Sequence, residues 1–210
     1  MRDSLFYCNG THQPVRSDDW LVAVRDGEYR AVIFDCDGTL VESAEAHFRS
    51  FHAALHAQGH HLDRDWYRSR TGLDRLSTFR AYAAEADKPV DIALAAKHSI
   101  QHFVANSTDV SCIPETAKLV QALAQSHPMA VGTNAEVAVA RASLEQVGLL
   151  EHFGHIASVS AGLSPKPAPD IFANAADFLG FARSETLVFE DSDEGVASAL
   201  AAGLDVIQLA

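Results

Sequence analysis

The chain has 210 residues, of which 48% are hydrophobic, enough for one core domain with a modest insertion. Its formal net charge of −12 argues against binding to nucleic acid or to an anionic membrane surface, because both require a basic surface. The three cysteines lack disulfide-like spacing and no secretion signal or long apolar run is evident, so we expect a cytoplasmic protein.

Residues 1–30 are polar, with one short apolar patch at 20–24. They could form a partly ordered arm, an extra edge strand or an oligomer contact. The sequence leaves these three alternatives open, and we expect a monomer or a small homo-oligomer.

A short apolar run at 32–34 ends abruptly in two carboxylates, Asp35 and Asp37, followed by a turn. Such a run is typical of a buried parallel strand, so the carboxylates are expected at its carboxyl end, where open α/β sheets bind ligands. Two crowded acids repel each other unless a cation lies between them, which favours a hard metal ion. One carboxylate can also attack a phosphorus atom. The alternative is a strand followed by an ordinary acidic turn.

Three later segments carry groups that suit phosphate chemistry. A second apolar run ends in Thr133 and Asn134, whose hydroxyl and amide can hydrogen-bond a phosphate oxygen. Lys166 lies between two prolines, in a stiff stretch before a predicted helix. A third apolar run ends in two more acids, Glu190 and Asp191. Each segment is ordinary alone, but together they supply a nucleophile, a phosphate ligand, a cation and metal ligands.

Between these segments apolar residues recur at helical spacing, so strands alternate with helices in the second half of the chain. This alternation predicts a doubly wound, Rossmann-like α/β fold whose sheet has five parallel strands. Strands are predicted over 32–34, 129–134, 155–159, 187–190 and 205–209, and helices over 116–123, 137–147 and 171–179.

The first crossover, between Leu40 and Val131, is far longer than one helix requires. Apolar residues within it mark three helices and no convincing strand. We therefore expect an all-helical insertion over 46–110 within an α/β core of residues 31–45 and 111–210. A purely structural insertion is the alternative to one that acts at the site.

The four motifs together resemble the haloacid dehalogenase superfamily of phosphotransferases, which use an aspartate nucleophile. The layout is similar to the β-phosphoglucomutase-like branch with its helical cap domain. Within that branch it resembles bacterial sugar phosphatases of the fructose-1-phosphate and 6-phosphogluconate type. The resemblance implies a Mg²⁺-dependent phosphatase that hydrolyses a small phosphorylated metabolite, above all a sugar phosphate, through an aspartyl-phosphate. It also implies that the insertion closes over the site, excludes water and selects the leaving group.

The resemblance assigns a role to each motif residue. Asp35 is the expected nucleophile, and Asp37 is the expected general acid and base, whose backbone carbonyl also binds Mg²⁺. Thr133, helped by the backbone of Asn134, is expected to hydrogen-bond the transferring phosphoryl group, and Lys166 is expected to neutralise its charge. The metal ligands that it implies are Asp35, Asp37, Glu190 and Asp191.

Two residues of the insertion are candidates for substrate binding. Arg75 falls at a cap-loop position that contacts substrate in the branch that the chain resembles, and a solvated arginine at a helix start is the alternative. His47 lies near the hinge and could orient Asp37 or the substrate, and a histidine on a helix face is the alternative. A phosphomutase, which needs a second cationic pocket near Lys97 or His98, is the alternative to a phosphatase. A catalytically idle binding or scaffold protein is the second alternative.

Overall fold

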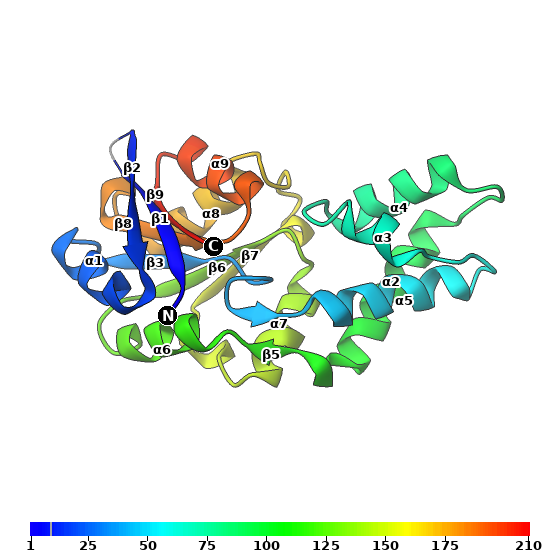
Figure 1. Cartoon of the computed structure of the whole chain (residues 1–210), viewed down its shortest axis with the longest axis horizontal. Coiled ribbons are helices and arrows are strands. Elements are labelled where there is room, and N and C mark those ends of the chain that lie inside the picture. Colours follow the sequence, from blue (N-terminus) through cyan, green and yellow to red (C-terminus); the bar gives the residue numbers. More distant parts are fainter. Residues whose placement is uncertain (9) are drawn as a thin grey trace.

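The computed structural model describes residues 1–8 and 10–210. Its central sheet has seven strands in the order β2-β1-β9-β8-β3-β6-β7. Five are mutually parallel, as predicted: β3 (Ala31–Phe34), β6 (Met129–Thr133), β7 (His155–Ser158), β8 (Thr186–Glu190) and β9 (Asp205–Leu209). Figure 1 shows this sheet with its helices at one end of the molecule and a group of helices at the other.

Helices cover both faces of the sheet, which confirms the doubly wound prediction. The core helices are α1 (Trp20–Asp26), α6 (Pro114–Leu123), α7 (Val137–Gln146), α8 (Asp170–Leu179) and α9 (Asp193–Ala201). Successive side chains of a strand point to opposite faces, so Val32 and Phe34 pack with α1, α6 and α7. Ile33 packs with α8 and α9 on the other face.

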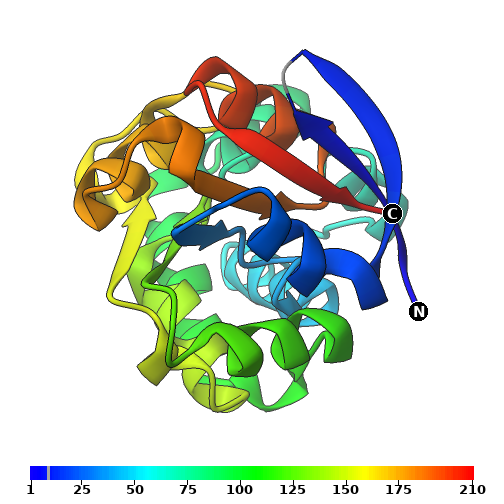
Figure 2. The same ribbon diagram turned by 90° about the vertical axis from the view of Figure 1, so that its left-hand side faces the viewer.

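Two further strands extend the five predicted parallel strands at one edge of the sheet. β1 (Asp3–Cys8) pairs antiparallel with β9, and β2 (Thr11–Arg16) pairs antiparallel with β1. Figure 2 shows this hairpin beside the C-terminal strand. The structure thus shows the edge-strand alternative for residues 1–30, whereas the apolar patch at 20–24 lies in α1. Because β2 is almost entirely exposed, its sequence carries no apolar alternation.

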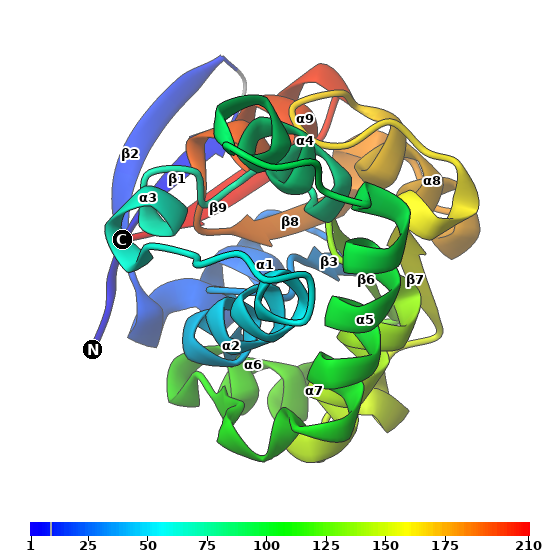
Figure 3. The same cartoon turned by 90° about the vertical axis from the view of Figure 1, so that its right-hand side faces the viewer.

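The insertion is helical, as predicted. It comprises α2 (Ala44–His56), α3 (Arg64–Arg68), α4 (Arg75–Glu85) and α5 (Ile92–Ala105). A two-stranded ribbon, β4 (Val41–Glu42) and β5 (Ser111–Cys112), joins it to the core. The helices share a separate apolar core that includes Phe51, Leu55 and Phe79. Figure 3 shows α2, α4 and α5 in front of the sheet. In the part of the chain that the structure describes, no helix is long and apolar enough to cross a membrane.

Candidate active site

The ends of three neighbouring strands meet at one edge of the sheet. β3 lies between β6 and β8, so Asp35, which follows β3, lies beside Thr133 and Glu190 at the ends of the other two strands. A cavity of about 630 Å³ opens at this edge, between the sheet and the insertion. Its lining brings together all nine predicted residues: Asp35, Asp37, His47, Arg75, Thr133, Asn134, Lys166, Glu190 and Asp191.

Lys166 lies at the centre of the site. Its Nζ donates to Asp35 Oδ1 at 2.6 Å and to Glu190 Oε2 at 2.7 Å, and its side chain is only 4% exposed. The ammonium also lies over the ring of Phe172, 4.5 Å from the centroid. Burial alone would lower the pKa of Lys166, but the two carboxylates outweigh burial and raise it. Lys166 is therefore a fixed positive charge beside Asp35.

Three carboxylates converge next to this ammonium. One oxygen from each of Asp35, Glu190 and Asp191 lies within 4.8 Å of the others. Burial, followed by the Glu190 charge, raises the pKa of Asp35 well above its usual value. The same two causes raise the pKa of Asp191 to about 7. Carboxylates that repel each other this closely suit a hard divalent cation such as Mg²⁺, which prefers oxygen ligands.

The three acids differ in how many of their carboxylate oxygens are left without hydrogen bonds and can bind a cation. Both oxygens of Glu190 are occupied, Oε2 by Lys166 and Oε1 by the hydroxyl of Ser192 and two backbone N–H groups. Asp35 Oδ2 makes no hydrogen bond to the described residues, and Asp191 accepts only a long one from Thr39, on Oδ1, at 3.3 Å. Asp35 and Asp191 can therefore bind a cation directly, while Glu190 orients the site.

Glycine allows this close packing at two positions. Gly38 has a φ of +90°, and a Cβ there would lie 2.2 Å from Asp191 Oδ2. A Cβ at Gly195 would lie 2.0 Å from the Glu190 carboxylate. Side chains at these positions would displace the two acids.

Asp37 faces the hinge and its carboxylate lies outside the group of three. Oδ1 accepts hydrogen bonds from Ser43 Oγ at 2.5 Å and lies 3.0 Å from His47 Nε2. Burial raises the pKa of Asp37, but the neighbouring His47 and Ser43 outweigh it and hold that pKa below its usual value. Asp37 is therefore held as a carboxylate that can accept a proton. Its expected metal contact, through the backbone carbonyl, stays a prediction.

Thr133 and Asn134 connect the sheet to the loops around it. Thr133 is buried at the end of β6, and its Oγ1 accepts from the N–H of Ala135 at 3.0 Å. Asn134 Oδ1 accepts from the backbone N–H of Lys166 at 2.8 Å, and its Nδ2 donates to the carbonyl of Gly72 at 3.4 Å. The Asn134 side chain thus holds the lysine loop and contacts the insertion.

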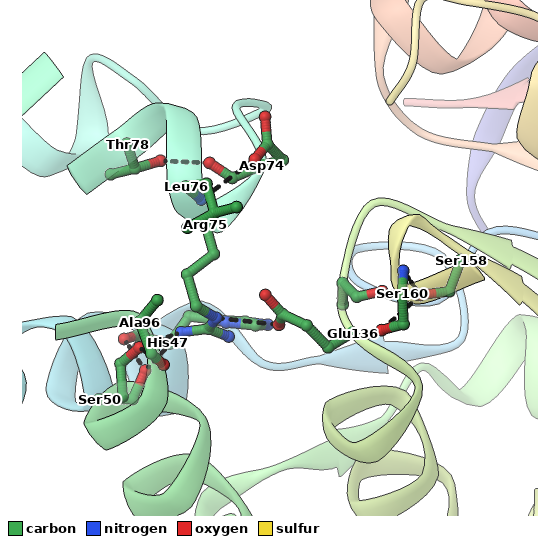
Figure 4. Close-up of polar contacts among 12 residues, drawn as sticks. His47, Ser50, Asp74, Arg75, Leu76, Thr78, Ala96, Glu136, Ser158 and Ser160 are labelled. Carbon is green, nitrogen blue, oxygen red and sulfur yellow. Dashed lines mark hydrogen bonds and ion pairs between the residues drawn. The ribbon is translucent and has the colours of Figure 1, made fainter. Parts of the chain in front are cut away.

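Arg75, at the start of α4, reaches from the insertion towards the core. Its side chain is 4% exposed, so the alternative of a solvated arginine is wrong. Nε donates to Glu136 Oε2 at 2.9 Å and Nη1 donates to Ser99 Oγ at 3.0 Å, while the guanidinium lies over the ring of Phe51. Figure 4 shows Glu136 meeting Arg75 from the opposite side of the cavity.

The comparisons with known proteins agree with this architecture. Residues 32–209 match the family model of haloacid dehalogenase-like hydrolases. The chain belongs to this family. It is 33% identical over 198 residues to Protein CbbY of Rhodobacter capsulatus, covering 86% of this chain and 85% of that protein. It is 30% identical over 190 residues to fructose-1-phosphate phosphatase YqaB of Escherichia coli K12, covering 86% of this chain and 96% of that protein.

A solved structure supports the same relationship. CbbY from Rhodobacter sphaeroides, crystallised with xylulose-1,5-bisphosphate, superimposes with a TM-score of 0.79 at 26% identity and covers 85% of this chain and 84% of its own. The N-terminal hairpin of the present chain lies outside the residues that match the haloacid dehalogenase-like family model.

Sequence reasoning missed two residues of this haloacid dehalogenase-like site. Glu136 follows the predicted strand end by a few residues, but its partner Arg75 is 61 positions away, so only the docked insertion reveals the pair. Ser43 lies six residues from its partner Asp37 and could have been noticed as a hydroxyl near the hinge. Neither Lys97 nor His98 is among the described residues that line the cavity.

Proposed function

We propose that the chain is a Mg²⁺-dependent phosphatase that hydrolyses a small sugar phosphate through an aspartyl-phosphate on Asp35. The observation that carries this proposal is the position of Asp35, with one oxygen held by Lys166 and the other unoccupied, at the end of the central strand. Membership of the haloacid dehalogenase-like hydrolase family supports the same chemistry.

In the first step, a carboxylate oxygen of Asp35 attacks phosphorus and the bond from phosphorus to the leaving oxygen breaks. Lys166 and Thr133 stabilise the charge on the transferring phosphoryl group, where fixed positive charge is most effective. Asp37 delivers a proton to the leaving alkoxide. Because His47 and Ser43 hold Asp37 as a carboxylate, Asp37 must first take up that proton.

In the second step, water attacks the phosphorus of the aspartyl-phosphate, and Asp37 accepts the proton of that water. The bond between phosphorus and Asp35 breaks and inorganic phosphate leaves. Dividing hydrolysis in this way replaces one difficult step by two easier ones. Asp35 and Asp191, with Glu190 orienting them, would hold Mg²⁺, whose charge would shield the nucleophile from the anionic substrate.

The relatives support a sugar phosphate as the substrate. YqaB is named as a fructose-1-phosphate phosphatase, and the CbbY structure contains a sugar bisphosphate. A cavity of about 630 Å³ is in the range that small metabolites occupy. We further propose that residues 46–110 act as a cap that closes over the core of 31–45 and 111–210, bringing Arg75 to the substrate with Asn134 and His47.

Phosphorus NMR of fructose 1-phosphate and β-glucose 1-phosphate, each incubated with the protein and Mg²⁺, tests this proposal. We expect inorganic phosphate to appear, with no isomerised sugar phosphate, and a chelator should stop its release. The Asp35→Asn protein is the matched control and should release none. Glucose 6-phosphate appearing before free phosphate would instead show a phosphomutase, and no reaction with any sugar phosphate would support an idle binding protein.

A further inference from the structure

Within residues 1–8 and 10–210, every lysine and arginine side chain that lines the cavity is already paired with an acid, and the one lining histidine contacts an acid as well. Lys166 contacts Asp35 and Glu190, and His47 contacts Asp37. The two arginines of the insertion are paired as well: Arg75 Nε lies 2.9 Å from Glu136, and Arg70 Nη2 lies 2.7 Å from Glu85. A phosphate at Asp35 would meet Lys166, but among the described residues the cavity wall offers no unpaired lysine or arginine for a second phosphate.

Glu136 is directed towards Arg75 rather than to its own helix. It occupies the position before the first residue of α7, and its side chain accepts no backbone N–H of that helix. Ser160 Oγ accepts the N–H of Val137 instead, at 3.1 Å. Figure 4 shows Glu136 between Ser160 on one side and Arg75 on the other. The Glu136 carboxylate is thus available to the cavity and to Arg75.

The guanidinium keeps one donor for a ligand. Nε and Nη1 are used by Glu136, Ser99 and Ser50, whereas Nη2 makes no hydrogen bond to the described residues. Arg75 and Glu136 both line the cavity, so a donor and an acceptor lie side by side on its wall. Sugar hydroxyls can bind both groups, because a hydroxyl accepts from a guanidinium and donates to a carboxylate.

We infer that Glu136 is a specificity-determining residue, which neutralises Arg75 so that the site accepts a sugar monophosphate and rejects a bisphosphate. This inference rests on the proposed phosphatase function and narrows its substrate class. A second phosphate would have to displace Glu136 from Arg75 and would then lie beside an unpaired carboxylate of the same sign. An uncharged polyhydroxylated leaving group meets no such repulsion and can use both side chains.

Fructose 1-phosphate and fructose 1,6-bisphosphate test the inference because they differ only in the second phosphate. The measured quantity is the ratio of kcat/KM for the bisphosphate to kcat/KM for the monophosphate. Wild type should favour the monophosphate. Glu136→Gln should raise the ratio about tenfold or more, because a charge-assisted contact becomes available to the second phosphate. Arg75→Met leaves Glu136 unpaired and should lower the ratio below that of wild type.

Glu145→Gln is the matched control, since it removes one negative charge from an exposed position on the same helix. Its ratio should equal that of wild type. An unchanged ratio in Glu136→Gln, or equal use of both substrates by wild type, would overturn the inference. Binding of both sugars to the Asp35→Asn background, measured by calorimetry, distinguishes this failure from loss of the proposed function. In the Asp35→Asn protein, the preference for binding the monophosphate should still depend on Glu136, even if no variant releases phosphate.

Discussion

Replacing Lys166 by methionine should destabilise the metal-free protein strongly. The ammonium lies 2.6 Å from Asp35 and 2.7 Å from Glu190, and the three side chains are 4%, 8% and 1% exposed. Removing one partner from a buried ion pair leaves an uncompensated charge and costs about 3–5 kcal/mol. A methionine fills most of the lysine stem, so this loss reports the charge rather than a cavity.

The loss should also depend on pH. Lys166 lowers the pKa of both carboxylates, so without it the already raised pKa of Asp35 rises further, and the pKa of Glu190, which is held below its usual value in the wild type, rises through burial. The folded variant then binds protons more tightly than the unfolded chain. A group whose pKa is raised by folding loses stability as pH increases through the folded value. The difference in unfolding free energy between wild type and variant should therefore be greater at about pH 8 than at about pH 5.

Urea denaturation in a chelator at both pH values measures this difference. Lys118→Met is the control, because Lys118 is exposed on α6, and it should stay within about 0.5 kcal/mol of wild type. A loss below about 1 kcal/mol at the higher pH, the size expected of a surface pair, would refute the claim that Lys166 holds two buried carboxylates.

Three further predictions concern catalysis and the metal. Asp37→Ala should lower kcat for phosphate release by about 10²–10⁴-fold, because general acid and base catalysis is lost; a loss below about tenfold would contradict its role. Asp191→Asn should raise the Mg²⁺ concentration needed for half-maximal activity, and a titration matching wild type would remove Asp191 from the metal site. Because burial and Glu190 raise the pKa of Asp191 to about 7, Mg²⁺ competes with protons there. Mg²⁺ should therefore raise the melting temperature more at about pH 8 than at about pH 5.5, and an equal rise at both would argue against binding at this carboxylate.

The parallel core was predictable because its central strands, β3, β6 and β8, are buried on both faces. Such strands appear as short apolar runs, and their ends are marked by polar residues such as Asp35 and Thr133. The N-terminal hairpin was not predictable in this way. β2 is largely exposed and contains Pro14, so neither apolar alternation nor strand propensity reveals it. Its position depends on pairing of β1 with β9 at the far end of the chain.

The residues of the site also differ in whether the sequence could predict their positions. The juxtaposition of Asp35, Thr133 and Glu190 was predictable because strand order brings the ends of β3, β6 and β8 together at one edge. The pair of Arg75 with Glu136 was not, because it depends on how α4 docks against the core. The sequence shows that Arg75 is present. Only the docked insertion shows that Arg75 pairs with Glu136 and which of its donors remains available to a ligand.

The most direct test of the account is to trap the covalent intermediate at Asp35. The protein is mixed with fructose 1-phosphate and Mg²⁺, quenched in acid during turnover, reduced with borohydride and digested for mass spectrometry. Reduction converts an aspartyl-phosphate to homoserine, so we predict homoserine at position 35 only when substrate is present. Unmodified Asp35 in a protein that is releasing phosphate, or homoserine at Asp37 or Asp191 instead, would contradict the account.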